Sequence, residues 1–268
     1  MGHFASNIPF SFADVFNKSV KDMFPDSEIA RQYSNGRTKA TQIVKGPTHM
    51  IEADILMRGS DPKEPIMAHP PDTDSDITLK EWLERVRLHN KGVKLDFKSL
   101  EAVSLSASML QKVLSQVRVP VWVNADILPG PGGEEAPLEP QAFLSIVRTL
   151  PSNVVLSIGW TTGWTAGTDN PGYSWDMVHE MEAICRGLKH LVTFPVRAAL
   201  LAKSVSQLTW LLQESNRYSL TVWTGQNDTF TVQDLLPYRT QMDVSRICYD
   251  LPDIIRTELI NISQDNIC

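Results

Sequence analysis

The sequence predicts an α/β fold, a single (β/α)₈ barrel of the TIM type, and three observations support this class. Short apolar runs rich in Val, Ile and aromatic residues alternate with segments of helical spacing along most of the chain. The length of 268 residues is close to the roughly 250 residues of such barrels. A hydrophobic content of 42% is enough to build one large core. We therefore expect parallel strands joined by crossover helices.

The strands are expected in the following order. The first lies within residues 28–33, where the sequence is polar and weakly periodic, so the first βα unit is predicted to be distorted. The other strands are apolar runs at 50–56, 92–97, 119–127, 154–160, 191–196, 219–223 and 246–249. Helical spacing appears between them, in Leu79, Trp82, Leu83 and Val86, over 100–117, and in Phe143, Ile146, Val147 and Leu150. The barrel then covers 28–260, between a partly disordered extension at 1–27 and a tail at 261–268.

Charge and cysteine content exclude several classes of protein. The net charge of −6 argues against a nucleic-acid-binding surface, because such proteins gather Lys and Arg on one face. The three cysteines, Cys185, Cys248 and Cys268, are widely separated and form no CxxC pair, so neither a disulfide framework nor a structural zinc site is expected. These features predict a protein of a reducing compartment.

The N-terminus has no pattern of a signal peptide, and no run is long enough for a membrane span, so a cytoplasmic location is expected. The first six residues, Met1 to Ser6, match the short pattern for myristoylation at Gly2. No basic cluster follows to provide a second anchor. A lipid at Gly2 would therefore give only weak membrane contact.

Acidic side chains gather where strands of the predicted barrel end. Glu52 and Asp54 point to one face of their strand, and Asp96 and Lys98 share a face of the next. The strand after that carries Asn124 and Asp126. The active site of a parallel barrel lies at these strand ends, and clustered carboxylates there repel one another unless a cation lies between them. The pattern predicts a site for Mg²⁺ or Ca²⁺, although a single motif of this kind is usually a solvated strand end.

Other residues near the predicted mouth could act on a substrate. His69 lies in the loop after the Glu52/Asp54 strand and is the best candidate for acid–base catalysis, because a histidine can donate a proton to an alkoxide leaving group. The alternative is a loop histidine that binds only backbone groups. Trp160, Arg197 and Trp223 also end strands. Aromatic walls with one arginine would suit a substrate with an anionic group and an apolar or sugar-like remainder.

Seven motifs in order resemble the menorin family, in particular its short B-type members without a membrane anchor. The resemblance covers about residues 48–250, and the motifs are Met50-Ile-Glu-Ala-Asp-Ile55, Pro65-Ile-Met-Ala-His-Pro-Pro71, Gly92-Val-Lys-Leu-Asp-Phe-Lys98, Asn124-Ala-Asp-Ile-Leu-Pro-Gly130, Gly159-Trp-Thr-Thr-Gly-Trp164, Thr193-Phe-Pro-Val-Arg197 and Ser219-Leu-Thr-Val-Trp-Thr-Gly225. That family is in turn similar to the glycerophosphodiester phosphodiesterases and sphingomyelinases D. Those barrel enzymes use an E-x-D pair, a further acid and two histidines.

The resemblance implies a role for each matching residue. Glu52, Asp54 and Asp96 would bind the metal, His69 would be one of the two catalytic histidines, and Lys98 would contact the phosphate or substrate. The mouth would be lined by Asn124, Asp126, Arg197 and Trp223. The substrate implied is a phosphodiester, either a small molecule or a lipid headgroup.

The chain departs from the family pattern at the first strand. Family members carry a Trp-Tyr-His-Ala stretch there, whereas this chain has Arg31-Gln-Tyr-Ser-Asn35 and no histidine between His3 and His49. Loss of one of two cooperating catalytic groups can cost several orders of magnitude in rate. The sequence thus leaves a metal-dependent phosphodiesterase and, as an alternative, a catalytically weak barrel that binds a ligand or protein. A third reading is a structural cation site that only stabilises the barrel.

Overall fold

The computed structural model describes residues 50–88, 91–116 and 120–265, which form an α/β fold around one eight-stranded sheet. The strands are β1 (Met50–Met57), β2 (Pro65–Met67), β3 (Gly92–Phe97), β4 (Val121–Pro129), β5 (Val155–Thr161), β6 (Leu191–Arg197), β7 (Tyr218–Trp223) and β8 (Ile247–Asp250). The α-helices are α3 (Leu79–Arg87), α4 (Leu100–Gln116), α5 (Pro140–Val147), α6 (Trp175–Cys185), α7 (Val205–Gln213), α8 (Val232–Thr240) and α9 (Asp253–Asp265). Two 3₁₀ helices complete them, η1 (Ala198–Lys203) and η2 (Val244–Arg246).

The order of strands in the sheet is β2-β1-β3-β4-β5-β6-β7-β8, and every neighbouring pair except β1–β2 is parallel. The seven strands predicted after residue 50 are confirmed, with ends that differ by no more than two residues. β2 is an addition, because its three residues lie in a segment that the sequence predicts as loop. The strand expected at residues 28–33 lies outside the described residues, and so does the extension at 1–27.

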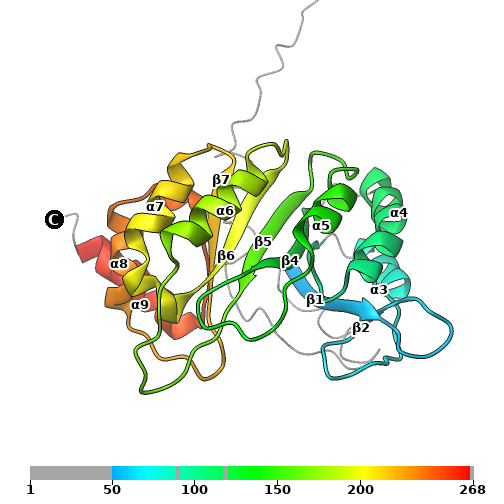
Figure 1. Cartoon of the computed structure of the whole chain (residues 1–268), viewed down its shortest axis with the longest axis horizontal. Coiled ribbons are helices and arrows are strands. Elements are labelled where there is room, and N and C mark those ends of the chain that lie inside the picture. Colours follow the sequence, from blue (N-terminus) through cyan, green and yellow to red (C-terminus); the bar gives the residue numbers. More distant parts are fainter. Residues whose placement is uncertain (1–49, 89–90, 117–119, 266–268) are drawn as a thin grey trace, which may run out of the picture.

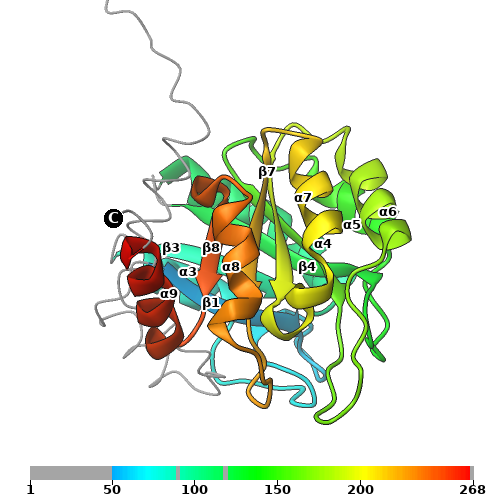
Figure 2. The ribbon, with the colours of Figure 1, turned by 90° about the vertical axis from the view of Figure 1, so that its left-hand side faces the viewer.

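The sheet curls, and the helices pack along its outer side (Figures 1 and 2). In β1 the apolar residues Ile51, Ala53 and Ile55 are buried on one side of the strand, while Glu52 and Asp54 alternate with them and are half-buried. The curl places β3 and β8, which are not neighbours in the sheet, within electrostatic range of each other, so Asp250 of β8 acts on Lys94 of β3. The described sheet is thus a half-barrel whose concave side carries polar groups, and a closed barrel is not part of it.

Helix α3 illustrates why the outer layer forms where it does. Its residues Leu79, Trp82, Leu83 and Val86 are all buried and follow helical spacing. The helix begins with a capping box, in which Thr78 accepts from the backbone N–H of Glu81 and the Glu81 carboxylate accepts from that of Thr78. None of the helices in the described ranges is long and apolar enough to cross a membrane.

Long loops follow β4, β5 and β7, at the ends of the strands where the polar side chains lie. They gather along the lower edge of the sheet in Figure 1. In parallel α/β folds this carboxyl-terminal edge is where binding and catalytic residues collect. The candidate site lies at this carboxyl-terminal edge of the sheet.

Candidate functional site

A row of polar side chains, the acidic row, runs across the concave side of β1, β3, β4 and β5. Strand register places Asp54 beside Asp96, Asp96 beside Asn124, and Asn124 beside Ser157. The Asn124 amide donates to Asp96 Oδ1 at 2.8 Å, and the Ser157 hydroxyl donates to Asn124 Oδ1 at 2.5 Å. Each group orients the next, so Asn124 holds the Asp96 carboxylate in place.

Lys98 lies between the two carboxylates of this row. Its Nζ atom is 2.7 Å from Asp96 Oδ2 and 3.2 Å from Asp54 Oδ1. Burial alone would lower the pKa of Lys98, but the two carboxylates raise it above its usual value. Burial tends to raise the pKa of Asp96, and the Lys98 and Lys94 ammonium groups outweigh it, so this pKa is lowered. Asp54 differs, because burial dominates there and raises its pKa.

A second ion pair lies deeper, between Lys94 and Glu52. Lys94 Nζ is 2.9 Å from Glu52 Oε1, and the two side chains are 11% and 14% exposed. Burial works against the charge on Lys94, yet Glu52, Asp96 and Asp250 raise its pKa overall. Glu52 Oε2 is buried and, among the described residues, has no hydrogen-bond partner. Lys94 thus engages one oxygen of Glu52, and the other oxygen is buried without a partner among the described residues.

Asp126 lies on β4 two residues after Asn124, opposite Gly159 of β5. Burial, reinforced by repulsion from Asp96, raises its pKa to about 7. A Cβ atom added at Gly159 would overlap Asp126 Oδ1, so the glycine makes the space that this carboxylate occupies.

The raised pKa of Asp126 predicts a pH-dependent loss of stability. Between the ordinary value of 3.8 and about 7 the folded protein keeps a proton that the unfolded chain has lost. The contribution of this group to the free energy of unfolding therefore falls as pH rises through that window and is constant above it. In Asp126→Asn the fall should be absent, so the stability of the variant relative to wild type should increase up to about pH 7.

Urea unfolding at a series of pH values, with a chelator present, measures this difference. Glu180→Gln, an exposed change on α6, is the matched control and should show no such trend. A difference between Asp126→Asn and wild type that does not change with pH would contradict the expectation.

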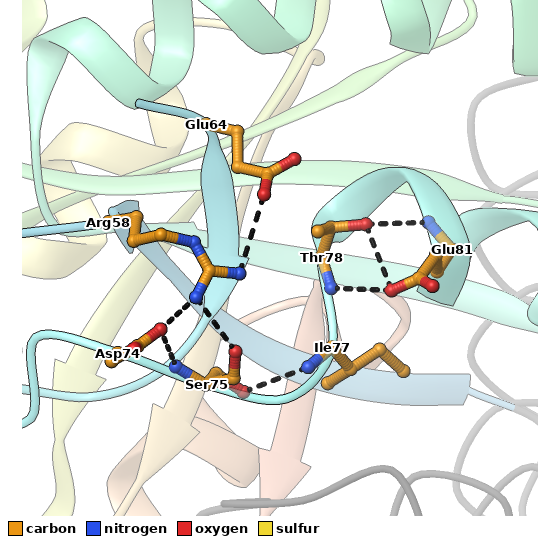
Figure 3. Close-up of polar contacts among 7 residues, drawn as sticks. All are labelled: Arg58, Glu64, Asp74, Ser75, Ile77, Thr78 and Glu81. Carbon is orange, nitrogen blue, oxygen red and sulfur yellow. Dashed lines mark hydrogen bonds and ion pairs between the residues drawn. The ribbon is translucent and has the colours of Figure 1, made fainter. Parts of the chain in front are cut away.

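His69 follows β2, in a loop that approaches the acidic row. The imidazole is half-buried, its Nδ1 lies 2.5 Å from the Pro70 carbonyl oxygen, and it acts electrostatically on Asp54. Arg58, at the end of β1, holds the flanking chain: it pairs with Glu64 at 3.4 Å, with Asp74, and donates to the Ser75 carbonyl at 3.1 Å (Figure 3). The structure therefore brings His69 to the same site as the carboxylates.

Arg197 and Trp223 lie together at the ends of β6 and β7. The guanidinium lies over the Trp223 ring, 5.4 Å from its centroid, and makes a two-pronged ion pair with Asp228, with Nε–Oδ2 at 2.7 Å and Nη2–Oδ1 at 2.5 Å. The Asp228 side chain is fully buried and also accepts from the backbone N–H of Gly225 at 2.8 Å. The backbone N–H of Arg197 donates to the Tyr173 hydroxyl at 3.0 Å.

Trp160 is placed differently from the other predicted contact residues. Its side chain is only 1% exposed, and the ring packs 5.1 Å from that of Tyr173 and 6.1 Å from that of Phe194. Strand alternation explains this position, because Thr161 lines the neighbouring pocket and Trp160 faces the other way.

A pocket of 460 Å³ opens beside Asp126, between the loops that follow β4 and β5. Its wall is formed by Asp126, Gly132, Glu134, Glu135, Thr161, Thr162, Gly163, Trp164, Thr165 and Trp223. The two loops touch closely: Gly163 donates its backbone N–H to the Pro131 carbonyl at 2.9 Å, and a Cβ atom at Gly163 would overlap the carbonyl oxygen of Gly132. Gly132 itself has a φ of +64°, which favours glycine.

Sequence reasoning missed four residues of this arrangement. Lys94 could have been found from its alternation with Asp96 and Lys98 along β3. Ser157, Tyr173 and Asp228 carry no sequence signal, because each acts through a partner that is distant along the chain.

Three carboxylates of this site are candidate ligands for a divalent metal. Glu52, Asp54 and Asp96 offer oxygen ligands of the kind that Mg²⁺ and Ca²⁺ prefer, and Glu52 Oε2 is a buried acceptor without a partner among the described residues. Within residues 50–88, 91–116 and 120–265 no three His, Cys, Asp or Glu side chains lie close enough together to hold an ion as they stand. The ammonium group of Lys98 occupies the space between Asp54 and Asp96. The chemistry of the donors fits a hard cation, which would compete with Lys98 for them.

Comparison with known proteins identifies relatives of the chain. The Menorin N-terminal domain family matches residues 30–256. Protein FAM151B from Homo sapiens is 51% identical over 220 residues, which cover 81% of this chain and 80% of that protein. Among solved structures, a GH18 chitinase from Pseudoalteromonas aurantia covers 78% of this chain and 74% of its own, at 11% identity and a TM-score of 0.35. The family match spans most of the molecule, including the acidic row and the pocket, and the chain therefore belongs to the menorin family.

Proposed function

We propose that this protein is a metal-dependent phosphodiesterase-like enzyme that acts on a phosphodiester at the carboxyl-terminal edge of its sheet. One observation carries the proposal: Glu52, Asp54 and Asp96 come from neighbouring positions on β1 and β3, with Lys98 between Asp54 and Asp96 and with His69 acting electrostatically on Asp54. A scaffold has no physical need to bury several carboxylates at one mouth, because desolvation and mutual repulsion make such a cluster costly.

Each residue has a role that its position supports. Glu52, Asp54 and Asp96 would hold Mg²⁺ or Ca²⁺, and the cation would neutralise charge on the phosphoryl oxygens. Lys98, displaced from between Asp54 and Asp96, would donate hydrogen bonds to the phosphate. His69 would hold or deliver a proton at the leaving oxygen. Asn124 would keep Asp96 oriented through its 2.8 Å hydrogen bond.

The proposal extends to the shape of the whole domain. Residues 28–33 would supply the strand that closes the sheet between β8 and the part of β1 before Ile55, which β2 does not pair, and this would make the half-barrel a complete (β/α)₈ barrel. The electrostatic action of Asp250 of β8 on Lys94 of β3 supports this, because these strands are not neighbours in the sheet and only a curled sheet brings them within range. We also propose a cytoplasmic location, with weak membrane contact if Gly2 is lipidated.

The second candidate function is a binding module without appreciable activity. The specific observation in its favour is that the first-strand histidine of the related enzymes has no counterpart in Arg31-Gln-Tyr-Ser-Asn35. The pairing of the carboxylates with Lys94 and Lys98 is also compatible with a barrel that needs no metal.

The test is turnover on a panel of phosphodiesters, measured with and without Mg²⁺ or Ca²⁺. The panel contains glycerophosphodiesters, lysophospholipids, sphingomyelin and a chromogenic diester. We expect metal-dependent turnover that falls by about 10²–10⁴-fold in His69→Ala, the usual range for loss of a general acid. Asp54→Asn should abolish turnover and weaken metal binding, measured separately by calorimetry.

Glu180→Gln on the exposed face of α6 is the control and should retain wild-type turnover. Intact metal binding without turnover of any diester would favour the binding module. If the cation only raises the melting temperature, and Glu52→Gln abolishes that effect without changing ligand binding, the site is structural.

A further inference from the structure

His69 lies in a loop, residues 68–76, that leaves β2 and leads to α3 (the His69 loop). The two ends of this loop are joined, because the N–H of Met67 donates to the Ile77 carbonyl at 3.2 Å. Within the loop, the N–H of Asp72 donates to the His69 carbonyl at 3.0 Å. The backbone next to the histidine is thus a closed turn, and its position depends on what holds the rest of the loop.

Arg58, the residue after β1, contacts this loop with its side chain (Figure 3). Its Nη1 atom donates to the Asp74 carboxylate and, at 3.1 Å, to the Ser75 carbonyl. Its Nη2 atom lies 3.4 Å from Glu64, in the loop before β2. The Arg58 side chain is only 14% exposed. One guanidinium therefore joins the His69 loop to the preceding loop and to the end of β1.

The backbone next to Arg58 contacts the same loop. The N–H of Gly59 donates to the Thr73 carbonyl at 2.8 Å, and a Cβ atom at Gly59 would lie 3.0 Å from Thr73 Cβ. Lys63 donates to the carbonyl oxygens of Arg58 and Gly59 at 3.3 and 2.9 Å. The end of β1 and the His69 loop thus form one packed unit, to which Arg58 contributes side-chain contacts.

The charges of the loop make it depend on this arginine. Three acidic residues, Asp72, Asp74 and Asp76, lie within five positions and repel one another, and the Arg58 guanidinium offsets this repulsion. Asp74 and Glu64 are 62% and 37% exposed, so water can solvate both carboxylates when the guanidinium is removed. Loss of Arg58 should therefore release the loop without unfolding the protein.

We propose that Arg58 is a positioning residue for His69: its guanidinium fastens the His69 loop to the end of β1 and so fixes the position of the imidazole. The role of His69 in turnover rests on the proposed function. The fastening of the loop does not, and it can be measured without a substrate. Because the guanidinium contacts two carboxylates and a carbonyl from two loops, the single ammonium group of a lysine should not replace it.

The first measurement combines hydrogen exchange of the Asp72 amide with the NMR signals of the His69 imidazole, without metal or substrate. In Arg58→Met the amide should exchange at least about 10-fold faster and the imidazole signals should shift, because the turn after His69 is no longer held. Arg58→Lys should resemble Arg58→Met. Arg148→Met, an exposed change at the end of α5, is the matched control and should leave both readouts unchanged.

Ionic strength gives a second readout, which a loss of packing alone would not change. Asp74 is largely exposed, so salt should screen its attraction to Arg58. Raising the salt concentration from about 0.01 M to about 1 M should speed exchange of the Asp72 amide in wild type and have no such effect in Arg58→Met. Asp74→Asn should give part of the effect of Arg58→Met and add nothing to it in the double variant.

Turnover tests the consequence for His69. In Arg58→Met, kcat on the chromogenic diester should fall by about 10-fold or more with KM little changed, because a misplaced proton donor weakens the transition state and not substrate binding. The same substitution in a His69→Ala background should cause no further loss. An equal loss of kcat in both backgrounds would overturn the positioning role.

The two kinds of readout separate this inference from the proposed function. Unchanged Asp72 exchange and unchanged His69 signals in Arg58→Met would overturn the positioning role, whether or not the protein cleaves a diester. If these readouts change as expected but wild type turns over no diester, the fastening of the His69 loop is supported and the proposed enzyme is overturned.

Discussion

Replacing Lys94 by methionine is expected to lower the free energy of unfolding by about 3–5 kcal/mol, the usual cost of removing one partner of a buried ion pair. The substitution keeps most of the apolar stem but leaves the Glu52 carboxylate without its 2.9 Å contact. Because Glu52 is only 14% exposed, water cannot replace the lost ammonium group. Chemical unfolding in the presence of a chelator measures the effect.

Two further variants make this test specific. Lys80→Met on the exposed face of α3 is the matched control and should change stability by less than about 0.5 kcal/mol. The double variant Glu52→Met/Lys94→Met removes both charges and should recover most of the stability, because an apolar pair of similar volume is often as stable as a buried ion pair. Equal losses in Lys94→Met and Lys80→Met would mean that the Lys94–Glu52 pair does not stabilise the fold.

Arg197→Met is expected to destabilise the protein by a similar amount, about 3–5 kcal/mol. The reason is that Asp228 is fully buried and loses two short hydrogen bonds to the guanidinium, while its bond to the Gly225 backbone remains. The loop between β7 and α8, which contains Asp228, should also become more mobile. Thermal unfolding measures the first effect, and hydrogen exchange in residues 224–231 measures the second.

The control for this prediction is another arginine with a short ion pair. Arg186 contacts Glu182 at 2.6 Å but is 67% exposed, so Arg186→Met should cost no more than about 1 kcal/mol. Comparable losses in the two variants would show that burial of Asp228 does not make the Arg197 pair more important.

The sequence predicted the part of the fold that depends on local patterns. The alternation of apolar strands and amphipathic helices after residue 50 gave seven parallel strands close to their true bounds. It did not predict β2, because a strand of three residues formed by pairing with the end of β1 has no periodicity of its own. Closure of the barrel stays a prediction, because the strand predicted at residues 28–33 lies outside the described part of the chain.

The sequence also predicted only part of the candidate site. Period-two alternation predicted that Glu52 and Asp54 share one face of their strand, and in the structure Asp54 and Asp96 both lie beside Lys98. His69 was predicted from its place in the loop after that strand, and its role stays a prediction. Alternation did not reveal that Lys94 and Lys98 already pair with these carboxylates, because the pairing depends on the register between β1 and β3, which the pattern of one strand does not contain. Trp160 and Thr161 are a further example. They are adjacent in β5, and a shift of one residue decides whether a side chain lines the pocket or packs in the core.

The contact between Gly132 and Gly163 constrains how the loops after β4 and β5 can diverge among related proteins. A side chain at Gly163 would overlap the Gly132 carbonyl oxygen, and one at Gly132 would be strained by its φ of +64° and lie 3.0 Å from the Gly163 carbonyl oxygen, so a larger residue at Gly163 would have to be accompanied by a rearrangement of the other loop. The two loops should therefore change together in evolution. Related proteins that bind different ligands would then differ at residues such as Trp164 and Glu135. These line the pocket or lie near it but take no part in the Gly132–Gly163 contact.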